Sequence, residues 1–169
     1  QMCLHLNTGV IRAAGCDLAY PSRDGAPGGD LQLKLPRPRD NPDRVPEFAR
    51  GVRWEIDRHC QGRPRLLLSE ENILGRMLHF QKGQFYPARR QRFAALRSGL
   101  PGPVAHLLLV VRPYHTLFPS AWRLRAQARA SVPFDRLRPV YMAMTEGWPD
   151  LVRDLRDSVS DFKLPDDAG

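Results

Sequence analysis

Long apolar runs are missing from this 169-residue sequence, which holds no stretch of about 18 apolar residues that could span a membrane. Cysteine is scarce too: Cys3, Cys16 and Cys60 follow no metal-binding spacing and cannot all pair with one another, which indicates a reducing compartment. The histidines are scattered, so we expect no metal site. The first residues lack the basic start and apolar centre of a secretory signal. These absences predict a cytoplasmic protein.

Lysine is also rare, because only Lys34, Lys82 and Lys163 among the 26 basic residues are lysines. The net charge is +8 and the isoelectric point is near 10.1. The arginines are dispersed and interleaved with acidic residues, as in DLVRDLRDSVSD, and they form no block or aromatic-interleaved stripe. A nucleic-acid partner is therefore not expected. Two interpretations stay open: a solvated arginine-rich surface, or a surface that binds an acidic polymer or partner.

Helical and strand-like segments alternate along the sequence. The strands are predicted at 16–21, 64–72 and 104–111, and the helices at 4–14, 46–62, 70–78, 87–102, from about 119, and at 148–162. Continuous apolar strands separated by helices are typical of a parallel sheet covered on both faces. We therefore predict one α/β domain over residues 1–169, with a long surface loop at 22–46 that is rich in proline, glycine and charge.

Polar residues follow two of the predicted strands, where parallel α/β sheets gather their ligands. Arg112 ends the apolar run at 104–111, and Ser120 follows eight positions later in the next predicted helix. A guanidinium, a hydroxyl and a helix start together suit a phosphate group. Alternatively, Arg112 pairs with a carboxylate and Ser120 is an ordinary helix-start residue. His115, in the turn after Arg112, is a further candidate donor.

Two glutamates follow the preceding strand. Glu70 or Glu71 at a strand end could accept a proton from an attacking hydroxyl. Alternatively, a glutamate in a first helical turn only stabilises the helix dipole. The arginines near them, at positions 76, 89, 90 and 92, either receive an anionic substrate or form a solvated helix face.

Two segments resemble sulfotransferases that use 3′-phosphoadenosine 5′-phosphosulfate (PAPS). HLLLVVRPYHTLFPSAWRLR is similar to their 3′-phosphate-binding segment, in which an apolar strand ends in Arg and a Ser follows eight positions later; Arg112 and Ser120 match both. RPRLLLSEENIL resembles the strand whose end carries the catalytic base. Cytosolic members place His there and some carbohydrate sulfotransferases place Glu; the matching residue here is Glu70, with Glu71 as the alternate.

The resemblance covers residues 1 to 162 in outline. Over this range the sequence is similar to bacterial sulfotransferase-like proteins. It implies a three-layer fold like that of P-loop NTPases. It also implies transfer of a sulfuryl group from PAPS, as co-substrate, to a hydroxyl or amine of a small molecule or carbohydrate, with no metal required.

One element of that family is missing from the sequence. In the family, a Gly-rich turn with Lys and Ser/Thr holds the 5′-phosphosulfate, and this sequence contains no such turn. In the family this turn precedes the first helix, with which this sequence opens. We therefore expect an N-terminally truncated fragment that is inactive by itself. The alternative is a non-catalytic basic α/β domain that binds an acidic polymer or protein partner. A nucleotide kinase is less favoured, because no Mg²⁺-ligand pair is visible.

Overall fold

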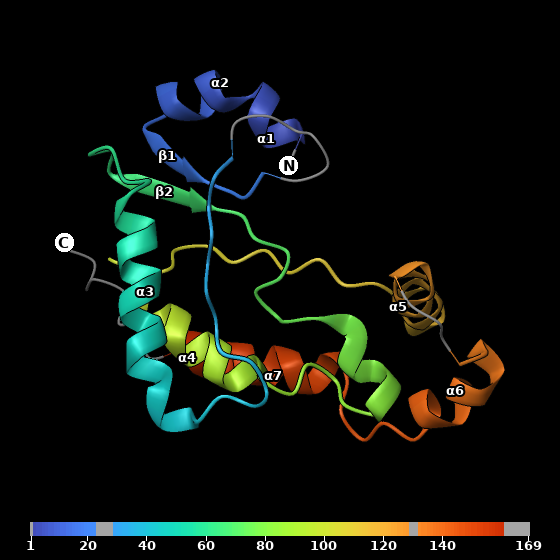
Figure 1. Cartoon of the computed structure of the whole chain (residues 1–169). Coiled ribbons are helices and arrows are strands. Elements are labelled where there is room, and N and C mark those ends of the chain that lie inside the picture. The colour runs from blue at the N-terminus through green and yellow to red at the C-terminus, as the bar shows by residue number, and fades with distance from the viewer. Residues whose placement is uncertain (1, 23–28, 129–131, 161–169) are drawn as a thin grey trace. The chain divides into compact units, whose positions relative to one another are not determined.

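A computed structural model of the chain describes residues 2–22, 29–128 and 132–160 (Figure 1). The chain divides into two compact units. Unit 1 comprises Gln1–Ile73 and Gln91–Gly102, and unit 2 comprises Leu74–Arg90 and Pro103–Gly169. The elements are a mixture of helices and parallel strands, which agrees with the broad α/β class. The three-layer arrangement and the single domain stay predictions.

Unit 1 begins with two short helices and contains the sheet. Helices α1 (Met2–Leu6) and α2 (Thr8–Ala13) replace the single opening helix that the sequence predicts, and Gly15 follows them with φ of 77°, a left-handed value that favours glycine. Strands β1 (Cys16–Ala19) and β2 (Arg65–Leu68) pair in parallel, from Cys16 opposite Arg65 to Ala19 opposite Leu68 (Figure 1). Two predicted strands and their parallel pairing are therefore confirmed.

A buried carboxylate anchors the start of this sheet. Asp17 on β1 is 2% exposed, and it accepts hydrogen bonds from the backbone N–H groups of Gln61 and Arg63 at 2.6 and 3.2 Å. The Arg63 guanidinium adds an ion pair at 2.7 Å. Burial disfavours the charged form of this carboxyl, but the hydrogen bonds outweigh burial and hold the pKa of Asp17 below its ordinary value. The chain that enters β2 is therefore fastened to β1.

Two helices supply most of the aliphatic core of unit 1. After the short 3-10 helix η1 (Pro42–Arg44) come α3 (Val45–Asp57) and, later in the chain, α4 (Arg89–Gly99), both close to their predicted positions. The core gathers side chains from the sheet, from both helices and from the segment before η1: Ala19, Leu31, Leu35, Val52, Ile56, Ala95 and Leu96.

The predicted surface loop at 22–46 needs a correction. Residues 23–28 lie outside the described residues, but Leu31 and Leu35 are 2% and 6% exposed and belong to the core. The buried carboxylate of Glu55 accepts a hydrogen bond from the backbone N–H of Gln32 at 2.8 Å, which fastens this segment to α3. The prolines and glycines around these leucines predict an irregular backbone. The sequence does not predict the burial, because the leucines are too few to form a periodic pattern.

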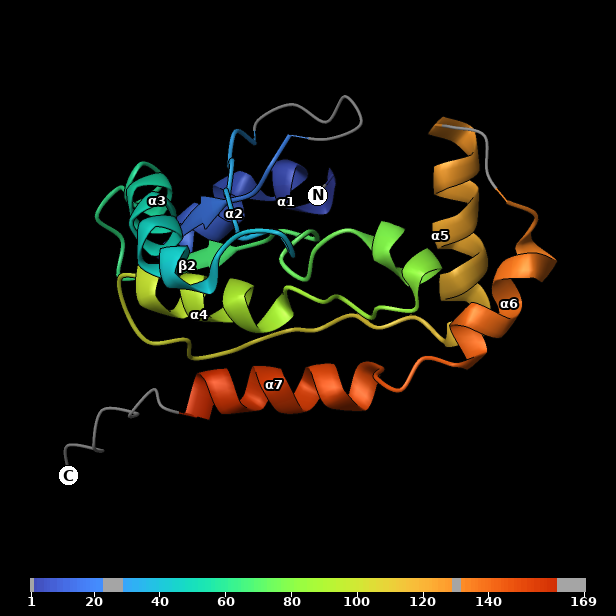
Figure 2. The ribbon, with the colours of Figure 1, turned by 60° about the horizontal axis from the view of Figure 1, so that its bottom comes forward.

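Unit 2 is helical. It contains the 3-10 helix η2 (Met77–Lys82) and the helices α5 (Tyr114–Ala128), α6 (Phe134–Met142) and α7 (Trp148–Ser160). Figure 2 shows η2 (green) beside α5 and α6 (orange), and these three elements contact one another. The final helix is confirmed through Ser160. The helix predicted at 70–78 is wrong, because residues 71–74 form turns and a helix begins only at Met77.

The core of unit 2 is aromatic. Phe80 on η2 is fully buried, and its ring stacks on Phe85 with a centroid distance of 5.2 Å and an interplanar angle of 6°. Phe118 on α5 meets Phe80 edge-on and stacks on Tyr141 of α6 at 4.7 Å. Such ring pairs contribute beyond their buried area. These contacts explain why η2, α5 and α6 lie together.

The strand predicted at 104–111 is wrong. These residues belong to no helix or strand, and the side chains of Leu108 and Val110 are 90% and 79% exposed. A strand needs a neighbouring backbone to complete its hydrogen bonds, and residues 104–111 form no ladder. The apolar run that predicted a buried strand is therefore an exposed extended segment before α5.

Candidate functional site

Arg112 and Ser120, which the sequence pairs as a phosphate clamp, lie together in unit 2. Nη1 of Arg112 donates a hydrogen bond to Oγ of Ser120 at 3.3 Å. The Arg112 side chain is exposed and Ser120 is half-buried. The guanidinium therefore reaches the hydroxyl from the solvent side, where an anion could accept hydrogen bonds from both groups.

The local structure around this pair differs from the expectation in two respects. Arg112 ends an extended segment without strand pairing, and α5 begins at Tyr114, five positions before Pro119, so that Ser120 lies in its second turn. The backbone N–H groups of Thr116 and Leu117 donate to the carbonyl of Pro113 at the helix start. Pro119 inside the helix misled the sequence analysis, because proline is typical of a first turn. The helix start therefore contributes no donors at Ser120.

The backbone of Arg112 is held by the start of α7. Nε1 of Trp148 donates to the carbonyl oxygen of Arg112 at 2.8 Å, and the backbone N–H of Trp148 donates to the hydroxyl of Tyr114 at 2.7 Å. Nothing in the sequence marks Trp148 and Tyr114 as residues that position Arg112. Trp148 is 36 residues from Arg112 and 34 residues from Tyr114, so no local sequence pattern connects them.

A buried tyrosine, Tyr86, interacts electrostatically with Arg112. Tyr86 is 7% exposed, and burial raises its pKa to about 12, although the positive charge of Arg112 acts in the opposite direction. Tyr86 also has a positive φ of 47°, which is strained for a bulky residue. Its phenol therefore stays protonated at neutral pH and provides no general base next to the clamp.

The two candidate bases lie in unit 1, directly after β2. The backbone N–H of Ser69 donates to the carbonyl of Ala19 at 2.9 Å and prolongs the strand pairing up to Glu70. Glu70 is half-buried and its Oε1 accepts a hydrogen bond from the backbone N–H of Asn72 at 2.7 Å, whereas Glu71 is exposed. These glutamates begin a turn and not a helix, so the helix-dipole interpretation does not apply to them.

Arg92 fixes the turn that carries these glutamates. Its guanidinium donates to three backbone carbonyls: those of Ile73 at 2.6 Å, Asn72 at 2.5 Å and Pro36 at 2.7 Å. Arg92 is thus a structural residue, and neither an anion receiver nor part of a solvated face. The glutamates belong to unit 1 and the clamp to unit 2. Their predicted meeting at one rim stays a prediction.

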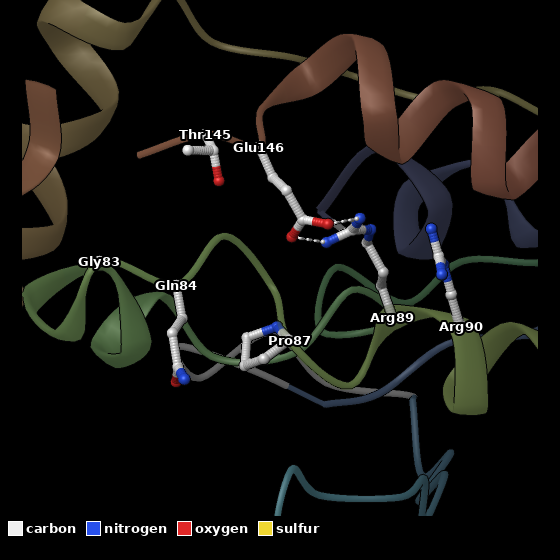
Figure 3. Close-up of a pocket in the computed structure, with 7 residues that line it drawn as sticks. All are labelled: Gly83, Gln84, Pro87, Arg89, Arg90, Thr145 and Glu146. Atoms are coloured by element: carbon white, nitrogen blue, oxygen red, sulfur yellow. Dashed lines mark hydrogen bonds and ion pairs between the residues drawn. The ribbon is translucent and has the colours of Figure 1, made fainter. Parts of the chain in front are cut away.

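Arg89 has a different role from the one that the sequence suggests. Its side chain is 4% exposed and forms a two-pronged pair with Glu146, at 2.9 Å for each nitrogen–oxygen contact (Figure 3). Its Nε donates to Asp154 at 2.6 Å and its Nη1 to the carbonyl of Phe85 at 2.8 Å. The hydrogen bonds with Glu146 raise the pKa of Arg89 above its ordinary value, so its charge is permanent.

A cavity of about 260 Å³ opens beside this ion pair in unit 2. Its lining includes Gln84, Pro87, Arg89, Arg90, Thr145 and Glu146. In Figure 3, Thr145 and Glu146 form one wall, from the segment before α7, and Gln84 and Pro87 face them from the segment before α4. The sequence carries no signal for this cavity, because its two walls are about 60 residues apart in the chain.

Within the residues that the structure describes, no cluster of three or more His, Cys, Asp or Glu side chains is arranged to hold a metal ion. Nor does any helix in those residues have the length and apolar character needed to cross a membrane. Comparison with known proteins finds no matching family model, no matching curated protein and no matching solved structure.

Proposed function

We propose that this chain is a sulfotransferase-like protein that binds PAPS through Arg112 and Ser120. The reaction of such a protein is transfer of the sulfuryl group to a hydroxyl or amine, and the present residues are inactive in it by themselves, because they contain no 5′-phosphosulfate turn. The observation that carries the proposal is the contact between the Arg112 guanidinium and the Ser120 hydroxyl, 3.3 Å apart on the surface of unit 2. The sequence resemblance assigns the same two residues to the 3′-phosphate. Their closeness supports that assignment, because a clamp needs both groups within reach of one phosphate.

In this proposal the arginine provides most of the binding free energy. A guanidinium offers two parallel N–H groups to two phosphate oxygens, and the serine hydroxyl adds one neutral donor. The Trp148 ring donates to the Arg112 carbonyl, and the Trp148 backbone N–H donates to the Tyr114 hydroxyl. These two contacts hold the backbone of Arg112 just before α5. The side chain can then exchange its Ser120 contact for the ligand without a backbone rearrangement.

Glu70 is the proposed base, with Glu71 as the alternate. The acceptor oxygen or nitrogen attacks the sulfur of PAPS, the bond between sulfur and the bridging oxygen breaks, and adenosine 3′,5′-bisphosphate leaves. The glutamate takes the proton that the acceptor loses. The carboxylate of Glu70 accepts a hydrogen bond from the Asn72 N–H, which helps to fix its orientation.

The test is calorimetric binding of adenosine 3′,5′-bisphosphate to the whole chain. We expect 1:1 binding that Arg112→Ala abolishes and Arg112→Lys weakens, because lysine loses the two-pronged geometry. Ser120→Ala removes one neutral hydrogen bond and should weaken binding about fivefold. Arg123→Ala is the matched control, since Arg123 is an exposed arginine of α5, the helix that carries Ser120; it should leave the dissociation constant unchanged.

A second candidate function rests on the net charge of +8. A non-catalytic domain that binds an acidic polymer would retain heparin when Arg112 is replaced, and its affinity would fall steeply with salt. Heparin binding that Arg112→Ala and Arg123→Ala weaken equally, together with no bisphosphate binding, would replace the sulfotransferase proposal with this one.

A further inference from the structure

The cavity beside Arg89 combines full charge compensation with exposed hydrogen-bonding groups. Arg89 forms ion pairs with Glu146 and Asp154, and Nε of Arg90 donates to Asp154 at 2.9 Å. Two guanidinium groups thus face two carboxylates, and the net charge of the cluster is zero. The hydrogen bonds from Arg89 lower the pKa of Glu146, so this carboxylate remains ionised at neutral pH.

Several groups at this cavity remain accessible to a ligand. The Glu146 side chain is 48% exposed although both of its oxygens bind Arg89, and each carboxylate oxygen can accept a further hydrogen bond. The side chains of Thr145 and Gln84 are exposed, and each can donate and accept. The Arg90 side chain is 76% exposed and presents donors only. Pro87 adds an apolar surface to the lining.

This combination of groups selects the chemistry of the ligand. An anion could reach the buried Arg89 guanidinium only by displacing Glu146, and near the exposed Arg90 it would be repelled by the Glu146 carboxylate of the same lining. A cation would meet the like charge of Arg90, which also lines the cavity. A neutral ligand with several hydroxyl groups meets neither obstacle, because each hydroxyl donates to one lining group and accepts from another. The volume of about 260 Å³ lies just below the range of about 300–1,000 Å³ that is common for drug-sized ligands, and it suits a single sugar ring.

We propose that the cavity lined by Gln84, Pro87, Thr145 and Glu146 binds one neutral, hydroxyl-rich ring, such as a hexose unit, with Arg89 holding Glu146 in place. Residues 145 to 148 link this cavity to the clamp, because Trp148 binds the backbone of Arg112. The sugar site does not depend on the proposed function.

The test uses the whole chain and saturation-transfer nuclear magnetic resonance with methyl glycosides of glucose, galactose and mannose and with N-acetylglucosamine. We expect at least one of them to bind with a dissociation constant of about 1–10 mM, as is reasonable for a small ligand with a few hydrogen bonds in an open cavity. Thr145→Ala and Gln84→Ala should each weaken binding about fivefold, the effect of losing one neutral hydrogen bond. Gln127→Ala, an exposed glutamine on α5, is the matched control and should change nothing.

A disaccharide with the best-binding unit at its non-reducing end should bind at least as well, if the natural source is the end of a glycan. A disaccharide that fails while the methyl glycoside binds indicates a free monosaccharide, and both results support the site. Three results overturn it: no sugar binds, binding ignores both lining variants, or inorganic phosphate binds instead and Glu146→Gln strengthens it. Sugar binding without bisphosphate binding removes the proposed function and leaves this site intact.

Discussion

The two units of this chain hold themselves together by different chemistry. Unit 1 packs aliphatic side chains of α3, α4 and the segment at 31–36 in one core with the residues of its parallel sheet, and backbone N–H groups bind its buried carboxylates. Unit 2 stacks aromatic rings and places a buried arginine between two carboxylates. Most of the aliphatic core of unit 1 can be predicted from the sequence, because the apolar residues of its helices recur with helical spacing. The core of unit 2 depends on pairs of residues that are far apart in the chain.

The comparison also separates structural from functional charge. In unit 1, Asp17, Glu55 and Arg92 bind backbone groups and hold segments in place. In unit 2, Arg112 stays exposed beside Ser120, and Glu146 is half-exposed beside a cavity. The partly exposed polar groups of unit 2 are therefore the better candidates for binding a ligand.

The largest expected effect is the loss of the buried arginine of unit 2. Arg89→Ala leaves Asp154, which is 9% exposed, without its shortest ion pair, and should lower the free energy of unfolding by about 3–5 kcal/mol. Arg53→Ala is the matched control in unit 1, because Arg53 and Asp57 form an exposed pair worth about 0.3–0.5 kcal/mol. Urea unfolding followed by tryptophan fluorescence measures both. Equal effects of the two variants would contradict the distinction between the units.

Truncating one buried side chain in the core of each unit tests whether the two units unfold separately. Phe80→Ala should cost about 3–5 kcal/mol and Ile56→Ala about 2–5 kcal/mol, because both side chains are fully buried. Hydrogen exchange should then rise in α5 for Phe80→Ala and in α3 for Ile56→Ala. If either variant raises exchange equally in both helices, the two units unfold as one cooperative body, as the predicted single domain requires.

Two glycines of unit 1 should respond with opposite signs. A Cβ on Gly99 would lie 2.6 Å from the carbonyl oxygen of Ala49 and from Cβ of Val52, so Gly99→Ala should destabilise by about 1–3 kcal/mol. A Cβ on Gly51, inside α3, meets no atom within 4 Å, and Gly51→Ala should stabilise by about 0.5–1 kcal/mol. Thermal unfolding of both variants measures this. A stable Gly99→Ala variant would show that α3 and α4 do not approach closely.

The smallest effect concerns pH. The pKa of Asp17 is lower in the folded protein than in the unfolded chain, so its contribution is present above the unfolded value, near 3.8, and is lost as the pH falls through the folded value. Unfolding midpoints between pH 7 and pH 3 should decline less for Asp17→Asn than for the original sequence. Glu146→Gln should flatten the decline in unit 2 similarly, because hydrogen bonds with Arg89 lower the pKa of Glu146. Parallel declines in all three proteins would refute both assignments.

Local patterns alone determined several elements of this protein. The apolar spacing of α3, α4 and α7, the short apolar strands β1 and β2, and the glycine after α2 were all readable, because each depends on residues a few positions apart. The spacing of Arg112 and Ser120 raised the possibility of a clamp, and the family resemblance assigned both residues to a phosphate, which stays a prediction. Their contact arises across nearly two turns of helix and not at a helix start.

The tertiary structure decided the rest. The apolar run at 104–111 forms no strand, because a strand is completed by a neighbouring backbone and not by its own side chains. Arg89 is buried, its neighbour Arg90 is exposed, and Arg92 binds three carbonyls, although from the sequence all three share the same two interpretations, as receivers of an anion or as a solvated helix face. Their partners come from distant parts of the chain, and only packing brings those partners near. The cavity beside Glu146 has the same origin, since folding alone joins its two walls.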